Sequence, residues 1–248
     1  MNQKSKMNKY MKSIAGMLTT AVVLLCACKA EEDVLTGPNP MTMTTSKSGE
    51  AAIHLIGDGT ATISWGNGAN ITKAINDDSL TLFTHTYTNT NLHNITISGS
   101  NITDLRCPVN QLTSLDVSKN TALTGLWCFD NQLTNLDVSK NTALSFLNFS
   151  VNQLTSLDVS TNTALSFLIC ANNQLTSLDV STNTALTVLY CQNNQLTSLD
   201  VSTNTALAVL YCQNNQLTKT ALDALFETLY TPRWAAYAER LSGNPPTI

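Results

Sequence analysis

Residues 110–130 read NQLTSLDVSKNTALTGLWCFD, and residues 131–151 read NQLTNLDVSKNTALSFLNFSV. The opening tetrapeptide recurs every 21 residues, beginning at Asn110, Asn131, Asn152, Asn173, Asn194 and Asn215. A fixed period of this length is typical of stacked units that cannot bury an apolar face alone. The sequence therefore predicts a solenoid over residues 101–218, built from coils of 21 residues.

Each unit contains the same half-pattern twice, over residues 112–120 and again over residues 123–131. In the second half, Leu126 and Cys128 form an apolar pair at positions i and i+2. On a strand, two such side chains point to the same side. We therefore expect both to face inward and the residue between them to face solvent. The same reasoning predicts two strand faces, an Asp-bearing face from the first half and a Cys-bearing face from the second.

This pattern resembles leucine-rich repeats, specifically the nested short type called IRREKO, and is less similar to the 22-residue unit of internalins. The resemblance covers residues 102–217. It implies a mainly β fold of stacked parallel strands and, by analogy, a module that binds a protein. The chain departs from the Leu-x-x-Leu-x-Leu signature at its last position, which holds Cys107, Cys128, Phe149, Cys170, Cys191 and Cys212.

We interpret the repeated cysteines as small buried hydrophobic residues. A ladder with a spacing of ~4.8 Å does not bring ligands to one point, as a zinc site requires. A disulfide between neighbouring coils needs the two Cβ atoms to approach to ~3.8 Å. The sequence therefore predicts free thiols, and it predicts neither a metal nor a cofactor.

A column of carboxylates recurs with the same period, at Asp116, Asp137, Asp158, Asp179 and Asp200. We expect a solvated column with serine hydroxyls beside it. Calcium binding is the alternative, although Ca²⁺ prefers six to eight oxygens around one point. The chain has no Gly-x-Ser-x-Gly, phosphate-binding glycine loop or His-Glu-x-x-His motif, so we do not expect an enzyme.

The outward positions of the Cys-bearing half differ from coil to coil and are often large and apolar. We expect these side chains to be exposed and to form the binding surface, because Trp and Tyr are enriched at interface hot spots. The alternative is that aromatic residues merely suit exposed strands. The predicted binding residues are Trp127, Phe129, Phe146, Phe167, Ile169, Tyr190 and Tyr211.

Four lysines precede an apolar stretch over residues 14–25, which predicts a secretory signal over residues 1–27. The stretch is too short for a membrane-spanning helix. Its end resembles a bacterial lipobox, which implies acylation of Cys28, because a small residue precedes Cys28 but not Cys26. Ordinary signal cleavage, with Cys28 left as a free thiol, is the alternative.

Residues 29–33 read KAEED and resemble the acidic export signal of surface lipoproteins in the Bacteroides group. This resemblance implies a lipid-anchored protein on the outer face of the outer membrane. Residues 28–48 are expected to be a flexible tether. The net charge of −4 becomes more negative once the signal lysines are removed, which gives no electrostatic case for binding nucleic acid.

Residues 49–100 alternate with a strand period. Trp65-Gly66-Asn67-Gly68, followed by His85-Thr86-Tyr87, resembles a shortened PKD-like β module. We expect a small sandwich-like cap that shares its core with the first coil. Residues 219–248 are expected to form a C-terminal cap, with a helix that starts at the capping-box signature of residues 220–223.

Two functional classes follow from the sequence. The first is a surface module that binds an extracellular protein, and the second is a glycan-binding surface lipoprotein whose aromatic residues stack on sugar rings. A platform of coplanar aromatic rings would favour sugar, and a patch with an aliphatic centre would favour protein. A structural spacer is a third reading.

Overall fold

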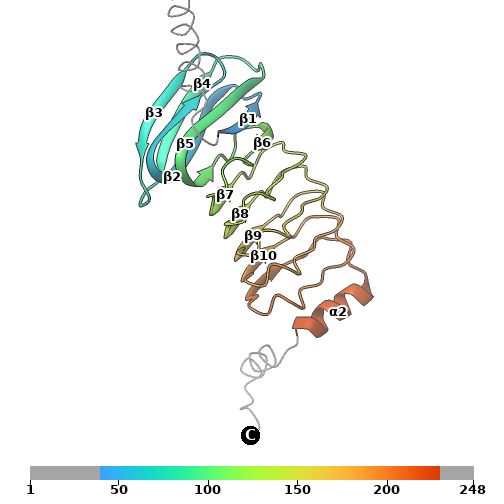
Figure 1. Ribbon diagram of the computed structural model, residues 1–248. Coiled ribbons are helices and arrows are strands. Elements are labelled where there is room, and N and C mark those ends of the chain that lie inside the picture. The colour runs from blue at the N-terminus through green and yellow to red at the C-terminus, as the bar shows by residue number, and fades with distance from the viewer. Residues whose placement is uncertain (1–39, 230–248) are drawn as a thin grey trace, which may run out of the picture. The chain divides into compact units, whose positions relative to one another are not determined.

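The computed structural model describes residues 40–229 (Figure 1). The predicted signal, the predicted lipid-attachment residue Cys28 and residues 230–248 of the predicted C-terminal cap lie outside the described residues. Among the described residues, no helix has both the length and the apolar character that crossing a membrane requires.

The chain before the repeats forms long antiparallel strands. They are β1 (Met41–Thr45), β2 (Gly49–Ser64), β3 (Asn70–Ile75), β4 (Thr81–Tyr87) and β5 (His93–Arg106). β2 pairs with β3, β4 and β5. Trp65 and Phe83 are fully buried, and Tyr87 Oη donates a hydrogen bond of 2.7 Å to the Trp65 carbonyl. These strands form the N-terminal module.

Strand β1 corrects the predicted tether. Met41, Met43 and Thr45 are buried, and β1 pairs antiparallel with β5 on one side and with β6 (Leu112–Asp116) on the other. The expectation of a flexible segment is therefore wrong over residues 41–45. The alternation of Met with Thr in this stretch fits a strand with one buried face.

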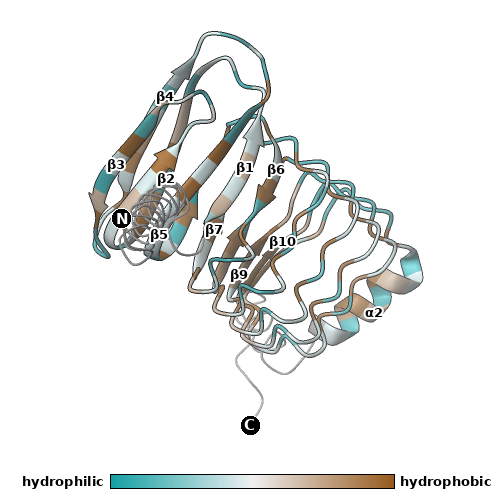
Figure 2. Cartoon of the chain, turned by 45° about the horizontal axis from the view of Figure 1, so that its top comes forward, coloured by the Kyte–Doolittle hydropathy of each residue, from teal (hydrophilic) through white to brown (hydrophobic). Residues whose placement is uncertain are grey.

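The repeats form parallel strands in register, as predicted. They are β7 (Gly125–Trp127), β8 (Phe146–Asn148), β9 (Phe167–Ile169), β10 (Val188–Tyr190) and β11 (Val209–Tyr211). β7 pairs with the last residues of β5, and each later strand pairs with the one before it. Figures 1 and 2 show these strands stacked along one side of the coils. In the described residues the result is one 11-stranded sheet, so the predicted boundary at residue 100 falls inside β5.

The Asp-bearing half does not form a second strand face. Only its first copy, β6, is a strand, and that strand pairs with β1 rather than with the next coil. In each copy the aspartate Oδ1 accepts the backbone N–H of the serine two residues later, for example Ser139 N–H to Asp137 at 2.9 Å. The first copy has the same bond and is still a strand, so its pairing with β1 is what sets it apart from the later copies.

The Asn ladder of the repeated tetrapeptide holds successive coils together. Asn152 Oδ1 accepts the N–H of Leu133 at 3.0 Å, and its Nδ2 donates to the carbonyls of Cys128 and Phe149 at 3.0 and 2.9 Å. Asn131 and Asn173 make the equivalent bonds. These buried amides therefore bond to backbone groups at the corner of their own coil and to the neighbouring coil.

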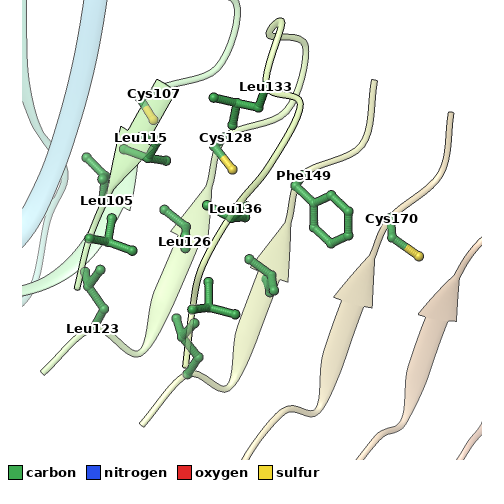
Figure 3. Packing of buried hydrophobic residues seen from close by; sticks show 14 of the residues in the cluster. Leu105, Cys107, Leu115, Leu123, Leu126, Cys128, Leu133, Leu136, Phe149 and Cys170 are labelled. Carbon is green, nitrogen blue, oxygen red and sulfur yellow. The ribbon is translucent and has the colours of Figure 1, made fainter. Parts of the chain in front are cut away.

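The inward side chains of the N-terminal module and of the coils belong to one apolar core. Figure 3 shows Leu126 and Cys128 on the same side of β7, with Phe149 in line between Cys128 and Cys170. Asn110, the first member of the ladder, bonds to the module: its Nδ2 donates to the Ala52 carbonyl at 2.7 Å. The module therefore takes the place of a preceding coil. It shares its core with the first coil, as expected from the sequence.

Helix α2 (Lys219–Leu229) follows the last coil. Leu225 is buried, as expected of a helix that covers an open coil end. The predicted start of the helix is wrong, because the cap residue is Thr218: its Oγ1 accepts the N–H of Ala221 at 3.1 Å. Asp223 Oδ2 instead accepts a hydrogen bond of 2.6 Å from Lys219 Nζ.

Candidate binding surface

The outward side chains of β7 to β11 form two columns on one surface. Register pairs align Gly125, Phe146, Phe167, Val188 and Val209 in one column. They align Trp127, Asn148, Ile169, Tyr190 and Tyr211 in the other. We define the aromatic face as the predicted binding residues Trp127, Phe129, Phe146, Phe167, Ile169, Tyr190 and Tyr211. The structure brings these residues to one side of the coils.

Exposure differs along the aromatic face. Phe167 and Tyr211 are exposed at 40% and 47% of their surface, as predicted from the strand parity. Trp127, Phe129, Phe146, Ile169 and Tyr190 are half-buried. The expectation of full exposure is therefore corrected for these five residues, because neighbouring side chains cover part of each one.

Aromatic rings stack along the solenoid axis. The Trp127 and Phe146 ring centroids are 3.9 Å apart with an interplanar angle of 14°, and the Phe146 and Phe167 centroids are 5.7 Å apart at 27°. The Arg106 guanidinium lies over the Trp127 ring, 4.6 Å from its centroid. The faces of Trp127 are therefore occupied, by Phe146 and by a cation–π contact with Arg106.

An ion pair orders the start of this stack. Arg106 Nε lies 2.7 Å from Asp104 Oδ1. The next residue in the Asp104 column is Gly125, and a Cβ there would lie 2.1 Å from Asp104 Oδ2. A glycine at this position makes room for the Asp104 carboxylate, which in turn holds the guanidinium against Trp127.

The middle of the second column is interrupted. Asn148 is buried, and its Oδ1 accepts the Ser150 N–H and hydroxyl at 3.1 and 2.8 Å. Beyond it, the Tyr190 and Tyr211 rings lie 4.7 Å apart at an interplanar angle of 50°. The described chain therefore carries an Arg–Trp–Phe–Phe stack at one end of the face and a tyrosine pair at the other.

The Asp column is held by local hydrogen bonds. Each aspartate accepts from the serine two residues later, and these bonds are the leading reason that the pKa of Asp116, Asp137, Asp158, Asp179 and Asp200 lies below its usual value. In residues 40–229 no group of three or more His, Cys, Asp or Glu side chains is arranged to hold a metal ion. This column therefore offers no preformed calcium site.

The repeat cysteines are free thiols in the described chain. Cys107, Cys128, Cys170 and Cys191 are buried, as predicted, whereas Cys212 is half-buried because it belongs to the last coil. Burial raises the pKa of Cys128 and of Cys191 to about 12. Thiolate is the reactive form, so these thiols are protected both sterically and chemically.

We expect a thiol reagent at pH 8 to label Cys212 first in the folded protein. The four buried thiols should react at least about a hundredfold more slowly, because burial limits access and disfavours the thiolate. Mass spectrometry of the labelled peptides measures each rate. In denaturant without reductant, all five should label. Any repeat cysteine that stays unlabelled in denaturant would contradict the assignment of free thiols.

Sequence reasoning missed a second feature of this surface, the turn that follows each strand. Val109 and Val151, in these turns, are exposed and have left-handed backbone angles, with φ of 57° and 55°. No residue type at either position signals this conformation. The sequence signal for a left-handed turn comes from the equivalent positions of the other coils, which hold Asp or Asn.

Comparison with known families identifies leucine-rich repeats within the chain. The family model described as Leucine Rich repeats (2 copies) matches residues 163–204 and 184–226. Together with the stacked parallel strands, this match makes the fold a mainly β leucine-rich-repeat solenoid, as predicted. A comparison with curated proteins finds no match.

Several solved structures are similar to part of the chain. The functional domain of InlJ from Listeria monocytogenes, which includes a cysteine ladder, is 39% identical over 46% of this chain and 30% of that chain, with a TM-score of 0.44. The internalin InlF from Listeria monocytogenes is 27% identical over 44% and 34%, with a TM-score of 0.41. A leucine-rich-repeat protein from Leptospira interrogans is 26% identical over 51% and 35%, with a TM-score of 0.49. The chain spans about a third of each of these structures.

Proposed function

We propose that the protein is a binding module that contacts an extracellular protein through the aromatic face. The observation that supports this proposal is the contrast between the two halves of each coil. The Asp-bearing half presents Thr, Ser and Asp to solvent, so the scaffold does not require apolar residues there. The strand half presents aromatic and aliphatic side chains in two adjacent columns, and such patches usually mark an interaction site.

The stacking geometry favours a protein over a glycan. A sugar ring stacks its C–H groups on the face of an aromatic ring, so that face must be open to solvent. Here Phe146 and Arg106 cover the Trp127 ring, and Phe167 packs against Phe146. The rings present mainly their edges to a partner. Ile169 adds an aliphatic surface beside Phe167, which suits apolar side chains of a protein.

The exposed ring of Tyr211 supports glycan binding as a second candidate function. This ring belongs to the last strand, is 47% exposed, and has a single aromatic neighbour, Tyr190, among the described residues. One open ring at the end of the face can accept one sugar ring. A platform of several rings, however, is not present on the rest of the aromatic face.

An array experiment separates these two functions. The chain without its predicted signal is applied to an array of purified extracellular proteins and to a glycan array. We expect the native chain to bind one of the proteins saturably, and we expect the Trp127→Ala variant to lose this binding. Binding restricted to glycans, and lost in Tyr211→Ala but not in Trp127→Ala, would replace the proposal with the glycan function.

We also propose that the protein is anchored to the outer membrane by acylation of Cys28 and displayed at the cell surface, and that residues 49–100 are a PKD-like module. The lipobox-like junction supports the anchor. The buried Trp65 and its bond from Tyr87 support a β module built around the quoted tryptophan motif.

Cys28→Ser is expected to abolish labelling by a radioactive or clickable fatty acid and to release the protein from the membrane fraction. The reason is that the thiol is the acyl acceptor. Cys26→Ser is the matched control and should leave labelling intact. Labelling that survives in Cys28→Ser, or disappears in Cys26→Ser, would show that the anchor is assigned to the wrong residue.

A further inference from the structure

Every coil has a left-handed residue at the same position of the turn after its strand, and the first turn has a second one, Gln111, with φ of 51°. We call the residues at the shared position the rim column. Their φ angles lie between 55° and 57°. The members are Val109, Asp130, Val151, Asn172, Asn193 and Asn214. The repeating coil geometry therefore imposes the left-handed conformation on whatever residue occupies this position.

Valine is poorly suited to the rim column. A β-branched side chain in the left-handed region is strained, whereas Asn and Asp adopt it readily. The later coils also gain from the amide: Asn193 Nδ2 donates to Asn172 Oδ1 at 2.9 Å, and Asn214 Nδ2 donates to Asn193 Oδ1 at 2.7 Å. The same position can therefore be filled with a residue that fits and bonds to its neighbour.

The two valines are also exposed. Val109 and Val151 expose 52% and 45% of their surface, so they gain little from burial. Each one thus combines backbone strain with exposed apolar area. Two separate costs to stability at the same two residues call for a role outside folding.

We propose that Val109 and Val151 extend the aromatic face onto the rim and contact the partner protein. This inference rests on the proposed function. Phe129 links the two surfaces, because it follows the strand of Trp127 and its carbonyl accepts the Val109 N–H at 3.2 Å. The contact region would then lie over the first coils, where Val109 and Val151 are next to the Trp127 stack.

Asp130 lies between the two valines in the rim column and defines the chemistry of the partner. It is exposed, and no ion pair in residues 40–229 engages its carboxylate. Lys47 Nζ donates a hydrogen bond to the Val109 carbonyl at 2.5 Å, and its charge interacts with that of Asp130 without forming an ion pair. An apolar–acidic–apolar row is complementary to a polypeptide that places a basic side chain between two apolar ones. An anionic lipid surface would be repelled by the same carboxylate.

Val109→Asn and Val151→Asn test this inference, with peptides selected on the full chain from a phage-displayed random library as the probe. We expect each variant to raise the Tm by about 2 °C or more, because Asn fits the left-handed turn. We expect the same variants to weaken peptide binding at least fivefold. The selected peptides should carry Lys or Arg flanked by apolar residues. A gain in stability together with a loss of binding is the result expected of a residue that contacts the partner at a cost to the stability of the fold.

Asn172→Val is the matched control, because it places valine in the same turn of a later coil. It should lower the Tm and leave peptide binding unchanged. Peptides that lose affinity for Trp127→Ala but keep full affinity for both valine variants would overturn the rim contact and leave the proposed function intact. Peptides that bind Trp127→Ala as tightly as the native chain would overturn the proposed function itself. Valine variants with an unchanged or lower Tm would overturn the argument from strain.

Discussion

Replacing Asn152 with alanine is expected to lower the free energy of unfolding by about 3 kcal/mol or more. The substitution leaves the Leu133 N–H unpaired and removes one of the two ladder bonds to each of the Cys128 and Phe149 carbonyls, which keep their bonds from Asn131 and Asn173. A buried polar group left unpaired costs about 1–3 kcal/mol. For a domain of this size, the loss corresponds to a fall in Tm of roughly 10 °C, measurable by thermal unfolding.

Two other alanine variants show how much of this loss of stability comes from the hydrogen bonds of Asn152. Gln153→Ala, at the exposed neighbouring position, should change the Tm little. Asn162→Ala should be intermediate: its Nδ2 donates to the Val138 and Asn141 carbonyls, but its Oδ1 has no hydrogen-bond partner in the described residues. Equal losses for Asn152→Ala and Asn162→Ala would show that packing, not the extra bond to Leu133, dominates the ladder.

Trp127→Ala is expected to weaken partner binding by about 2 kcal/mol, or roughly 30-fold in Kd. Trp127 lies within the stack between Arg106 and Phe146, so its removal also disorders the groups on either side. Loss of the ring contacts and of the half-buried ring area should lower stability by about 2 kcal/mol. Binding to the protein identified on the array and thermal unfolding measure the two effects separately.

Phe167→Ala and Asp137→Asn are the companion variants. Phe167 is more exposed than Trp127, so its truncation should reduce affinity with a smaller change in Tm. Asp137 lies in the other half of the coil and is exposed, so its neutralisation should leave affinity nearly unchanged. A large fall in Tm for both aromatic variants, without loss of affinity, would assign the aromatic face to packing.

Much of the repeat architecture could be predicted from the sequence, because each coil repeats the same local rule. The inward position of Leu126 and Cys128 follows from strand parity, and the buried role of Asn152 follows from the need to satisfy backbone groups at a corner. The same parity places Trp127 and Phe167 on the outer surface. These features depend on residues close in the sequence or one period away.

Other features needed the tertiary structure because their partners are distant or act collectively. Residues 41–45 alternate like a strand, yet only pairing with residues 93–97 and with β6 gives that strand two neighbours. The Asp-bearing half has the same apolar spacing as the strand half, but only its first copy is a strand, because only that copy pairs with the distant strand β1.

The period, the inward and outward sides of the strand half, and the residues of the aromatic face could all be predicted from the order of residues. The orientation of those rings and the positions of backbone strain became visible only in the folded chain. Strand parity predicts that the Trp127 side chain points outward. The orientation of its ring depends on stacking against Phe146 of the neighbouring strand, which parity does not predict. Val151 has no local preference for a left-handed turn. It adopts one because the coils above and below hold the turn in that shape, and stacking contacts, unlike side-chain periodicity, do not exist until the coils are assembled.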